Sequence, residues 1–182
     1  MERKILWNKA AIAGLYFGVI SSAYLFANYG IAHIPGCPAF VGGLLNAVLW
    51  IAKFGGCIYL MMYLMKKLVA ADKDATNSDT FKFGAITSLL SAVIYSAVYF
   101  AYTAYIANDE IVDTFNQLIN TPGIAIDSNT LSGMSSMMEN LPQIGFWGNL
   151  VYCFLFGIIL SAILSSRIPA RNPFGQDKAE EL

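Results

Sequence analysis

The chain has 182 residues, of which 57% are hydrophobic and only 13% are charged, and its mean hydropathy is +0.55. Soluble domains usually carry about 25% charged residues, so this composition excludes an ordinary soluble protein and indicates a membrane protein. The net charge of −1 excludes a basic nucleic-acid-binding protein.

The first part of the chain predicts a helical hairpin in the membrane. No Lys, Arg, Asp or Glu occurs between Ala10 and Ala52, and this apolar run is interrupted once, by two prolines and a glycine within residues 33–38. Such residues do not continue a helix, so we predict two spans, over about residues 10–32 and 39–65. The basic N-terminus resembles a secretory signal, but the first apolar run is longer than the apolar core of a signal peptide, so we expect it to be retained.

The second part predicts two more spans, over about residues 83–107 and 144–166. Each of the four predicted spans is long enough to cross a hydrocarbon core of about 30 Å at about 1.5 Å per residue. Strands are excluded because these runs are apolar on all sides and much longer than the strands of a membrane barrel. A helix also satisfies its own backbone hydrogen bonds where no water is present.

The connection between the third and fourth spans, residues 108–143, predicts two short amphipathic helices. Residues 120–123, Asn-Thr-Pro-Gly, stop the first helix, Asp127 or Ser128 caps the second, and Pro142 ends it. The apolar positions at helical spacing are Ile111, Val112, Phe115, Leu118 and Ile119, followed by Leu131, Met134, Met138 and Leu141. The predicted fold is all-α: residues 1–182 form a single integral membrane domain, a polytopic four-transmembrane-helix bundle with two short amphipathic helices in the outer, periplasmic segment.

The basic residues set the expected orientation. Ten of the eleven Lys and Arg residues lie outside the spans, all of them before residue 10, in residues 66–82 or after residue 166. The hairpin loop and residues 108–143 carry none, whereas residues 108–143 carry five acids. The positive-inside rule therefore predicts that both termini lie in the cytoplasm and the acidic connection lies outside.

Several short segments in the second half resemble a small family catalogued as domain of unknown function 4199. They are Phe-Lys-Phe-Gly at 81–84, Asp109-Glu110, Met137-Met138 before Leu141-Pro142, Gly-Ile-Ile-Leu-Ser-Ala-Ile at 157–163, and Arg-Ile-Pro-Ala-Arg-Asn-Pro-Phe at 167–174. The resemblance covers roughly the last hundred residues by motif and the rest by topology. It implies four spans and a multi-pass protein of the Gram-negative inner membrane, and it implies no established activity.

The polar residues do not form a recognisable catalytic set. The only histidine, His33, lies in the outer turn, and no acid lies in any span, so a nucleophile in the membrane has no base beside it. We therefore expect no enzyme, no catalytic residues and no cofactor. His33 and Cys37, together with Met134, Met137 and Met138, could supply soft ligands for Cu(I). The methionines are better explained as the apolar face of a helix, and we expect no metal site.

Lys53 is the one charged residue within a predicted span, and it defines a candidate functional polar face with Asn46 and Asn149. Asn46, Trp50, Lys53 and Cys57 share one side of their helix. An isolated Lys at the middle of a span costs about 2.5–3.5 kcal/mol to insert. Either Lys53 extends along its own helix to the outer headgroups, or this face points into the bundle and attracts an anion or a partner's carboxylate.

Small residues recur every fourth position in two spans, at Gly14 and Gly18 and at Gly157, Ser161 and Ser165. Such ladders let helices approach closely, and packing within one chain is the simpler interpretation. Two functions fit the sequence. The first is a non-catalytic accessory or scaffold subunit of a membrane complex, which would contact the lipid bilayer and another membrane protein or a second copy of itself. The alternative is a small oligomeric transporter or channel that uses the polar face around Lys53.

Overall fold

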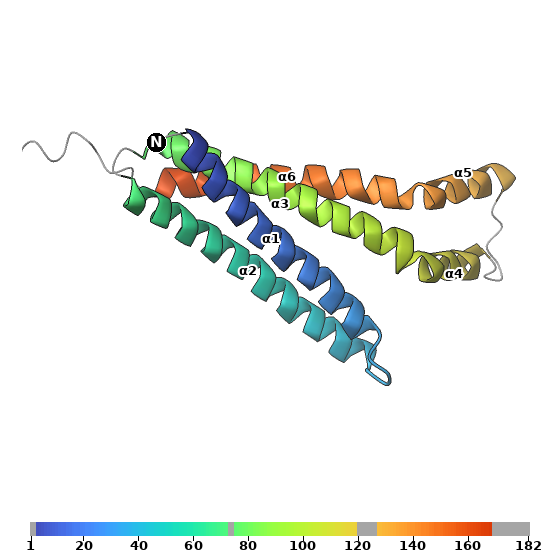
Figure 1. Cartoon of the computed structure of the whole chain (residues 1–182). Helices are drawn as coiled ribbons and strands as arrows, with labels where there is room; N and C mark the ends of the chain where they lie inside the picture. The colour runs from blue at the N-terminus through green and yellow to red at the C-terminus, as the bar shows by residue number, and fades with distance from the viewer. Residues whose placement is uncertain (1–2, 73–74, 120–126, 169–182) are drawn as a thin grey trace, which may run out of the picture.

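The structure, a computed structural model, describes residues 3–72, 75–119 and 127–168, and every regular element within them is an α-helix. In chain order the helices are α1 (Arg3–Ala32), α2 (Ala39–Ala71), α3 (Asn77–Tyr105), α4 (Asn108–Ile119), α5 (Ser128–Glu139) and α6 (Leu141–Arg167) (Figure 1). Four of them, α1, α2, α3 and α6, are long and apolar enough to cross a membrane. The predicted all-α fold is confirmed, with four helices long and apolar enough to span a membrane and two short helices between the third and the fourth.

The long helices extend beyond the predicted spans. Helix α2 continues past Lys66 to Ala71, and α3 begins at Asn77, ahead of the apolar run that starts at Phe83. The start of α3 is fixed by reciprocal hydrogen bonds: the Thr76 side chain accepts from the Asp79 amide, and the Asp79 carboxylate accepts from the Thr76 amide. The span limits were predicted from the apolar residues alone. The ends of a helix are instead set by capping and helix-breaking residues, which can lie beyond the apolar run.

The outer helices agree with the prediction in their positions and in one cap. The Asp127 side chain accepts a hydrogen bond from the Thr130 amide at the start of α5, as expected for an N-cap. The prediction that Pro142 ends this helix is wrong: α5 ends at Glu139, and Pro142 lies in the first turn of α6, where its missing amide hydrogen is not needed. The predicted stop at residues 120–123 lies outside the described residues.

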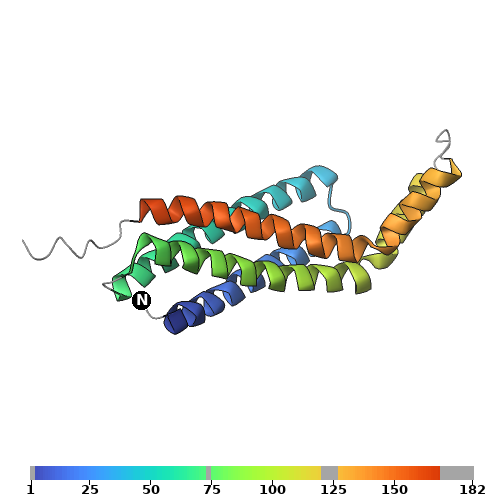
Figure 2. The same ribbon diagram turned by 90° about the horizontal axis from the view of Figure 1, so that it is seen from above.

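Helix α3 is the centre of the bundle and packs along both α1 and α6, while α2 packs mainly on α1 (Figures 1 and 2). The α1–α2 hairpin diverges from α3 and α6 toward its loop. Helices α4 and α5 continue from α3 and α6 beyond the point of divergence. The ribbons of the two helix pairs are therefore closest at one end of the molecule, here named the closed end, and lie farther apart toward the hairpin loop.

The hydrophobic core lies at the closed end. Its buried members come from all four long helices and include Leu6, Ala10, Ala13, Phe17, Met61, Met65, Leu68, Phe83, Leu164 and Ile168. Glycines bring the helices together here: a Cβ added at Gly84 would meet Ser161 and Met65, and one added at Gly157 would meet Ser88. The small residues that the sequence singled out thus pack within the chain.

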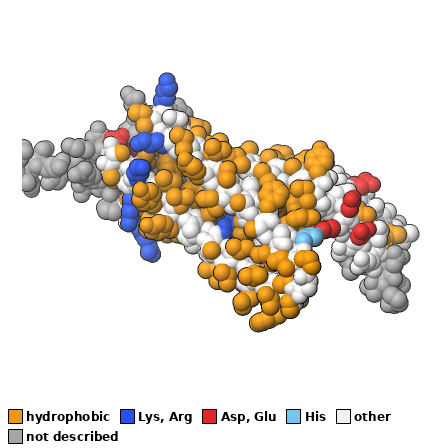
Figure 3. Space-filling model, turned by 60° about the horizontal axis from the view of Figure 1, so that its bottom comes forward, with side chains coloured by type: hydrophobic (Ala, Val, Ile, Leu, Met, Phe, Trp, Pro, Cys, Tyr) orange, Lys and Arg blue, Asp and Glu red, His pale blue; other side chains and the backbone are white. Residues whose placement is uncertain are grey.

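Charged side chains gather at the two ends of the molecule. On the face shown in Figure 3, Lys and Arg lie mainly at the closed end, Asp and Glu lie mainly at the end formed by α4 and α5, and hydrophobic side chains cover most of the surface between them. This is the distribution expected for a bundle whose middle is in contact with lipid.

Candidate functional site

A cavity of about 180 Å³ lies between the long helices, adjoins the core and is open on one side, where Trp50 and Tyr152 are exposed. All four long helices contribute to its wall, and Phe17 and Met61 belong to both the cavity and the core. Much of the remaining wall is aromatic: Trp50 and Phe54 on α2 stack with their ring centroids 5.2 Å apart, and Phe156 on α6 lies 5.1 Å from Phe54. Helices α2 and α6 make few other contacts, so the bundle is least closed on this side.

Lys53 points into this cavity. Its Nζ lies 4.5 Å from the ring centroid of Tyr24 on α1 and 5.3 Å from that of Tyr95 on α3. A cation over an aromatic ring contributes about 0.5–2 kcal/mol, so two rings offset a large part of the roughly 2.5–3.5 kcal/mol cost of a Lys at mid-span. This geometry favours the inward orientation of Lys53 over extension along α2 to the headgroups.

Lys53 has no carboxylate partner in the part of the chain that the structure describes, where the one ion pair joins His33 and Glu110. Two cavity hydroxyls, those of Ser21 and Ser91, likewise make no hydrogen bond to a described residue. The neighbouring Ser88, in contrast, donates to the Gly84 carbonyl of its own helix at 2.8 Å. The cavity therefore combines a cation and two free hydroxyl donors with an apolar, aromatic wall.

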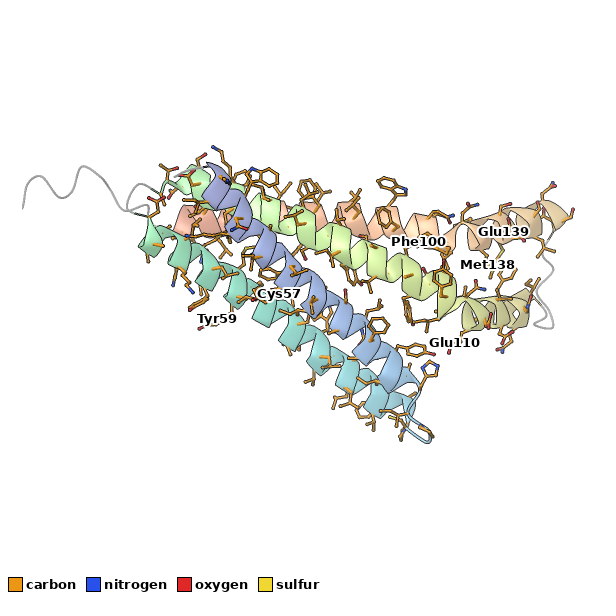
Figure 4. All side chains as sticks on the ribbon, viewed as in Figure 1. Cys57, Tyr59, Phe100, Glu110, Met138 and Glu139 are labelled. Carbon is orange, nitrogen blue, oxygen red and sulfur yellow. The ribbon has the colours of Figure 1, made fainter. Side chains whose placement is uncertain are left out.

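The other two residues of the predicted polar face lie elsewhere. Asn46 lines a separate pocket of about 230 Å³ near the hairpin loop, and its Oδ1 is buried without a hydrogen-bond partner, as is that of Asn28 on α1. The Asn149 Nδ2 donates to the Gly145 carbonyl of its own helix at 2.8 Å. Trp50, Lys53 and Cys57 do face the same cavity, as their spacing predicted; Figure 4 labels Cys57 on α2. Asn28 carried no signal that separated it from other polar residues near a span end.

An ion pair beside the hairpin loop joins the two halves of the chain. The Nε2 atom of His33 lies 2.5 Å from the Glu110 Oε1 on α4, and its Nδ1 lies 2.8 Å from the Tyr29 carbonyl oxygen. The hydrogen bond to Tyr29, and then that to Glu110, raise the pKa of His33 above its usual value. The sequence placed both residues on the outer side but could not pair positions 77 residues apart.

Helices α4 and α5 enclose a pocket of about 280 Å³ between their apolar sides. Its wall includes Ile111, Val112 and Phe115 on α4 and Met138 and Glu139 on α5; Figure 4 labels the last two. No residue of α5 is fully buried, and Val112 is 39% exposed. The apolar faces that the sequence predicted are thus covered only in part.

The family described as "Protein of unknown function (DUF4199)" has a sequence model that matches residues 13–166. The match covers most of the chain and reaches from the first span to the fourth, so the chain belongs to this family. Comparison with curated proteins and with solved structures found no match.

Proposed function

We propose that this member of the DUF4199 family is a non-catalytic accessory or scaffold subunit of a complex in the bacterial inner membrane. Its partner is another membrane protein, whose extramembrane segment binds the outer helices α4 and α5. The single observation that carries the proposal is the half-exposed apolar groove between these two helices, which extends past the hairpin loop.

Charge complementarity defines the partner's chemistry. Residues 108–143 contain no Lys or Arg, and the five acids of this segment are exposed: Asp109, Glu110, Asp113, Asp127 and Glu139. Figure 3 shows acidic side chains gathered at this end. A segment that places apolar side chains in the groove and basic side chains on this acidic rim would match both features. We expect the acidic end to face the periplasm and both termini to face the cytoplasm, because the basic residues lie at the opposite end.

A non-catalytic role agrees with the use of the only histidine. Both ring nitrogens of His33 are already engaged, by the Tyr29 carbonyl and by Glu110. The imidazole therefore supports the contact between the hairpin loop and α4, and a role as a general base would require breaking that contact.

The proposal is tested by site-specific photocrosslinking in native membranes. A photoreactive residue at Val112, in the groove, is expected to give one adduct of constant stoichiometry, and the same residue at Tyr59, which is 64% exposed on α2, is the control. Combining the Val112 probe with Glu139→Gln should reduce the adduct strongly, because Glu139 is the carboxylate that lines the groove. Equal adducts from Val112 and Tyr59, or an adduct unaffected by neutralising Glu139, would contradict the proposal.

A small oligomeric transporter or channel is the second candidate function. The observation that favours it is the cavity that Lys53 lines inside the bundle. Reconstitution into proteoliposomes tests it directly: anion flux that requires the chain and is lost in Lys53→Met would support transport, and flux equal to that of empty vesicles would exclude it.

A further inference from the structure

We infer that the cavity around Lys53 is a binding site for a small aromatic carboxylate that enters from the bilayer. This inference is independent of the proposed accessory role, since it concerns the interior of the bundle and not the outer helices. Binding at this site requires no transport.

The charge of the site selects an anion. The Lys53 ammonium lies over the rings of Tyr24 and Tyr95, and no carboxylate of the described chain pairs with it. The faces of aromatic rings stabilise a cation but leave its N–H groups without a strong acceptor. A carboxylate supplies that acceptor, and its second oxygen can accept from the free hydroxyls of Ser21 or Ser91.

The size and lining of the cavity select a small aromatic body. At about 180 Å³ the cavity is slightly larger than the engineered apolar cavity of about 150 Å³ that admits benzene in another protein. The rings of Trp50, Phe54 and Phe156 line it together with Tyr95. A single ring carrying one carboxylate fits the volume, and its flat faces can stack against these side chains.

The route into the site is lateral. Helix α2 packs mainly on α1, and α6 packs on α3, so the sparsest contact around the cavity is that between α2 and α6. The Phe54–Phe156 ring contact lies across this side. An aromatic acid that has partitioned into the membrane can therefore reach Lys53 between α2 and α6, where Trp50 and Tyr152 at the cavity wall are exposed.

Trp50 reports binding because it lines the cavity. The chain has three tryptophans, and Trp7 and Trp147 do not line this cavity, so Trp7→Phe with Trp147→Phe leaves Trp50 as the one tryptophan and the one reporter. This variant is reconstituted into nanodiscs and titrated with 4-bromobenzoate, whose bromine quenches tryptophan fluorescence on contact. The neutral 4-bromobenzyl alcohol is the matched probe for partition into lipid alone.

We expect saturable quenching by 4-bromobenzoate and only linear quenching by the alcohol. Lys53→Met should weaken the affinity of the saturable phase at least about tenfold, equivalent to about 1.4 kcal/mol. The control Lys67→Met, whose side chain is exposed and lies outside the cavity, should leave that affinity unchanged. Should Lys53→Met not fold, Ser91→Leu decides the question, because it keeps the charge and fills the cavity, and it should abolish saturation. Absence of saturation in the parent, equal saturation by the alcohol, or unchanged binding in either cavity variant would overturn the inference.

Discussion

Replacing Gly157 by Ala should destabilise the contact between α3 and α6. A Cβ at this position would collide with the Oγ and Cβ of Ser88 and lie 3.5 Å from the Ser88 Cα. Ser88 cannot simply turn away, since its hydroxyl donates to the Gly84 carbonyl and its Cβ is fixed to the backbone of α3. The two helices must therefore move apart, and overpacking of this kind costs about 1–3 kcal/mol.

Gly148→Ala on the same helix is the matched control. A Cβ at Gly148 meets no atom within 4 Å, so the substitution adds only the gain in helix propensity, about 0.5–1 kcal/mol. The same gain is present in Gly157→Ala and cancels in the comparison. The difference between the two variants should thus equal the overpacking cost of about 1–3 kcal/mol.

Equilibrium unfolding in mixed micelles of increasing SDS content measures this difference, with circular dichroism and Trp fluorescence as two readouts. If Gly157→Ala proves as stable as Gly148→Ala, then α3 and α6 do not approach each other at Ser88, and the packing described above is wrong. A loss confined to Gly157→Ala would support the close approach of the two helices at the core.

Two further predictions concern the orientation in the membrane and the His33–Glu110 pair. In a chain without its native cysteines, Ser128→Cys should react with an impermeant thiol reagent added outside, and Ser78→Cys should react only after the membrane is opened; the reverse pattern would invert the orientation. NMR of the imidazole of His33 should give a pKa above the usual 6.5, and Glu110→Gln should lower that pKa only in part, because the bond to the Tyr29 carbonyl remains. Since the folded pKa is raised, the stability that this pair adds is present below about pH 6.5 and is lost as the pH rises through the folded pKa; a stability independent of pH in this range would contradict it.

The spans could be predicted from sequence because the bilayer imposes a simple rule. An apolar run of sufficient length without charges must be a helix, and the breakers within residues 33–38 separate the first two spans as expected. The true ends could not be read in the same way. Helix α2 continues through Lys66, and α3 begins at Asn77 after a capping residue. Polar residues at a membrane surface are compatible with both helix and loop, so hydropathy alone does not locate these ends.

Helical spacing correctly predicted which residues of one helix share a face, but it did not predict which residues of different helices lie together. The spacing placed Trp50, Lys53 and Cys57 together, and all three line the cavity. The prediction that Asn149 lies beside Lys53 was not based on a periodicity. The position of Asn149 relative to α2 depends on how the helices cross, and its side chain donates to its own helix. The divergence of the hairpin, which places Asn46 in a different pocket from Lys53, is likewise set by packing between helices.

The rings of Tyr24 and Tyr95 explain how a charge persists at mid-span without a carboxylate, and this explanation can be measured. If the ammonium gains about 0.5–2 kcal/mol from the Tyr24 ring, Tyr24→Leu should destabilise the parent by that amount more than it destabilises a Lys53→Met variant. The lost apolar area is nearly the same in both backgrounds, so the double-mutant cycle isolates the cation–ring contact. Unfolding in SDS mixed micelles supplies the four free energies. A coupling energy of zero would mean that Lys53 does not lie over Tyr24, and that the ammonium leaves the bundle for the headgroups after all.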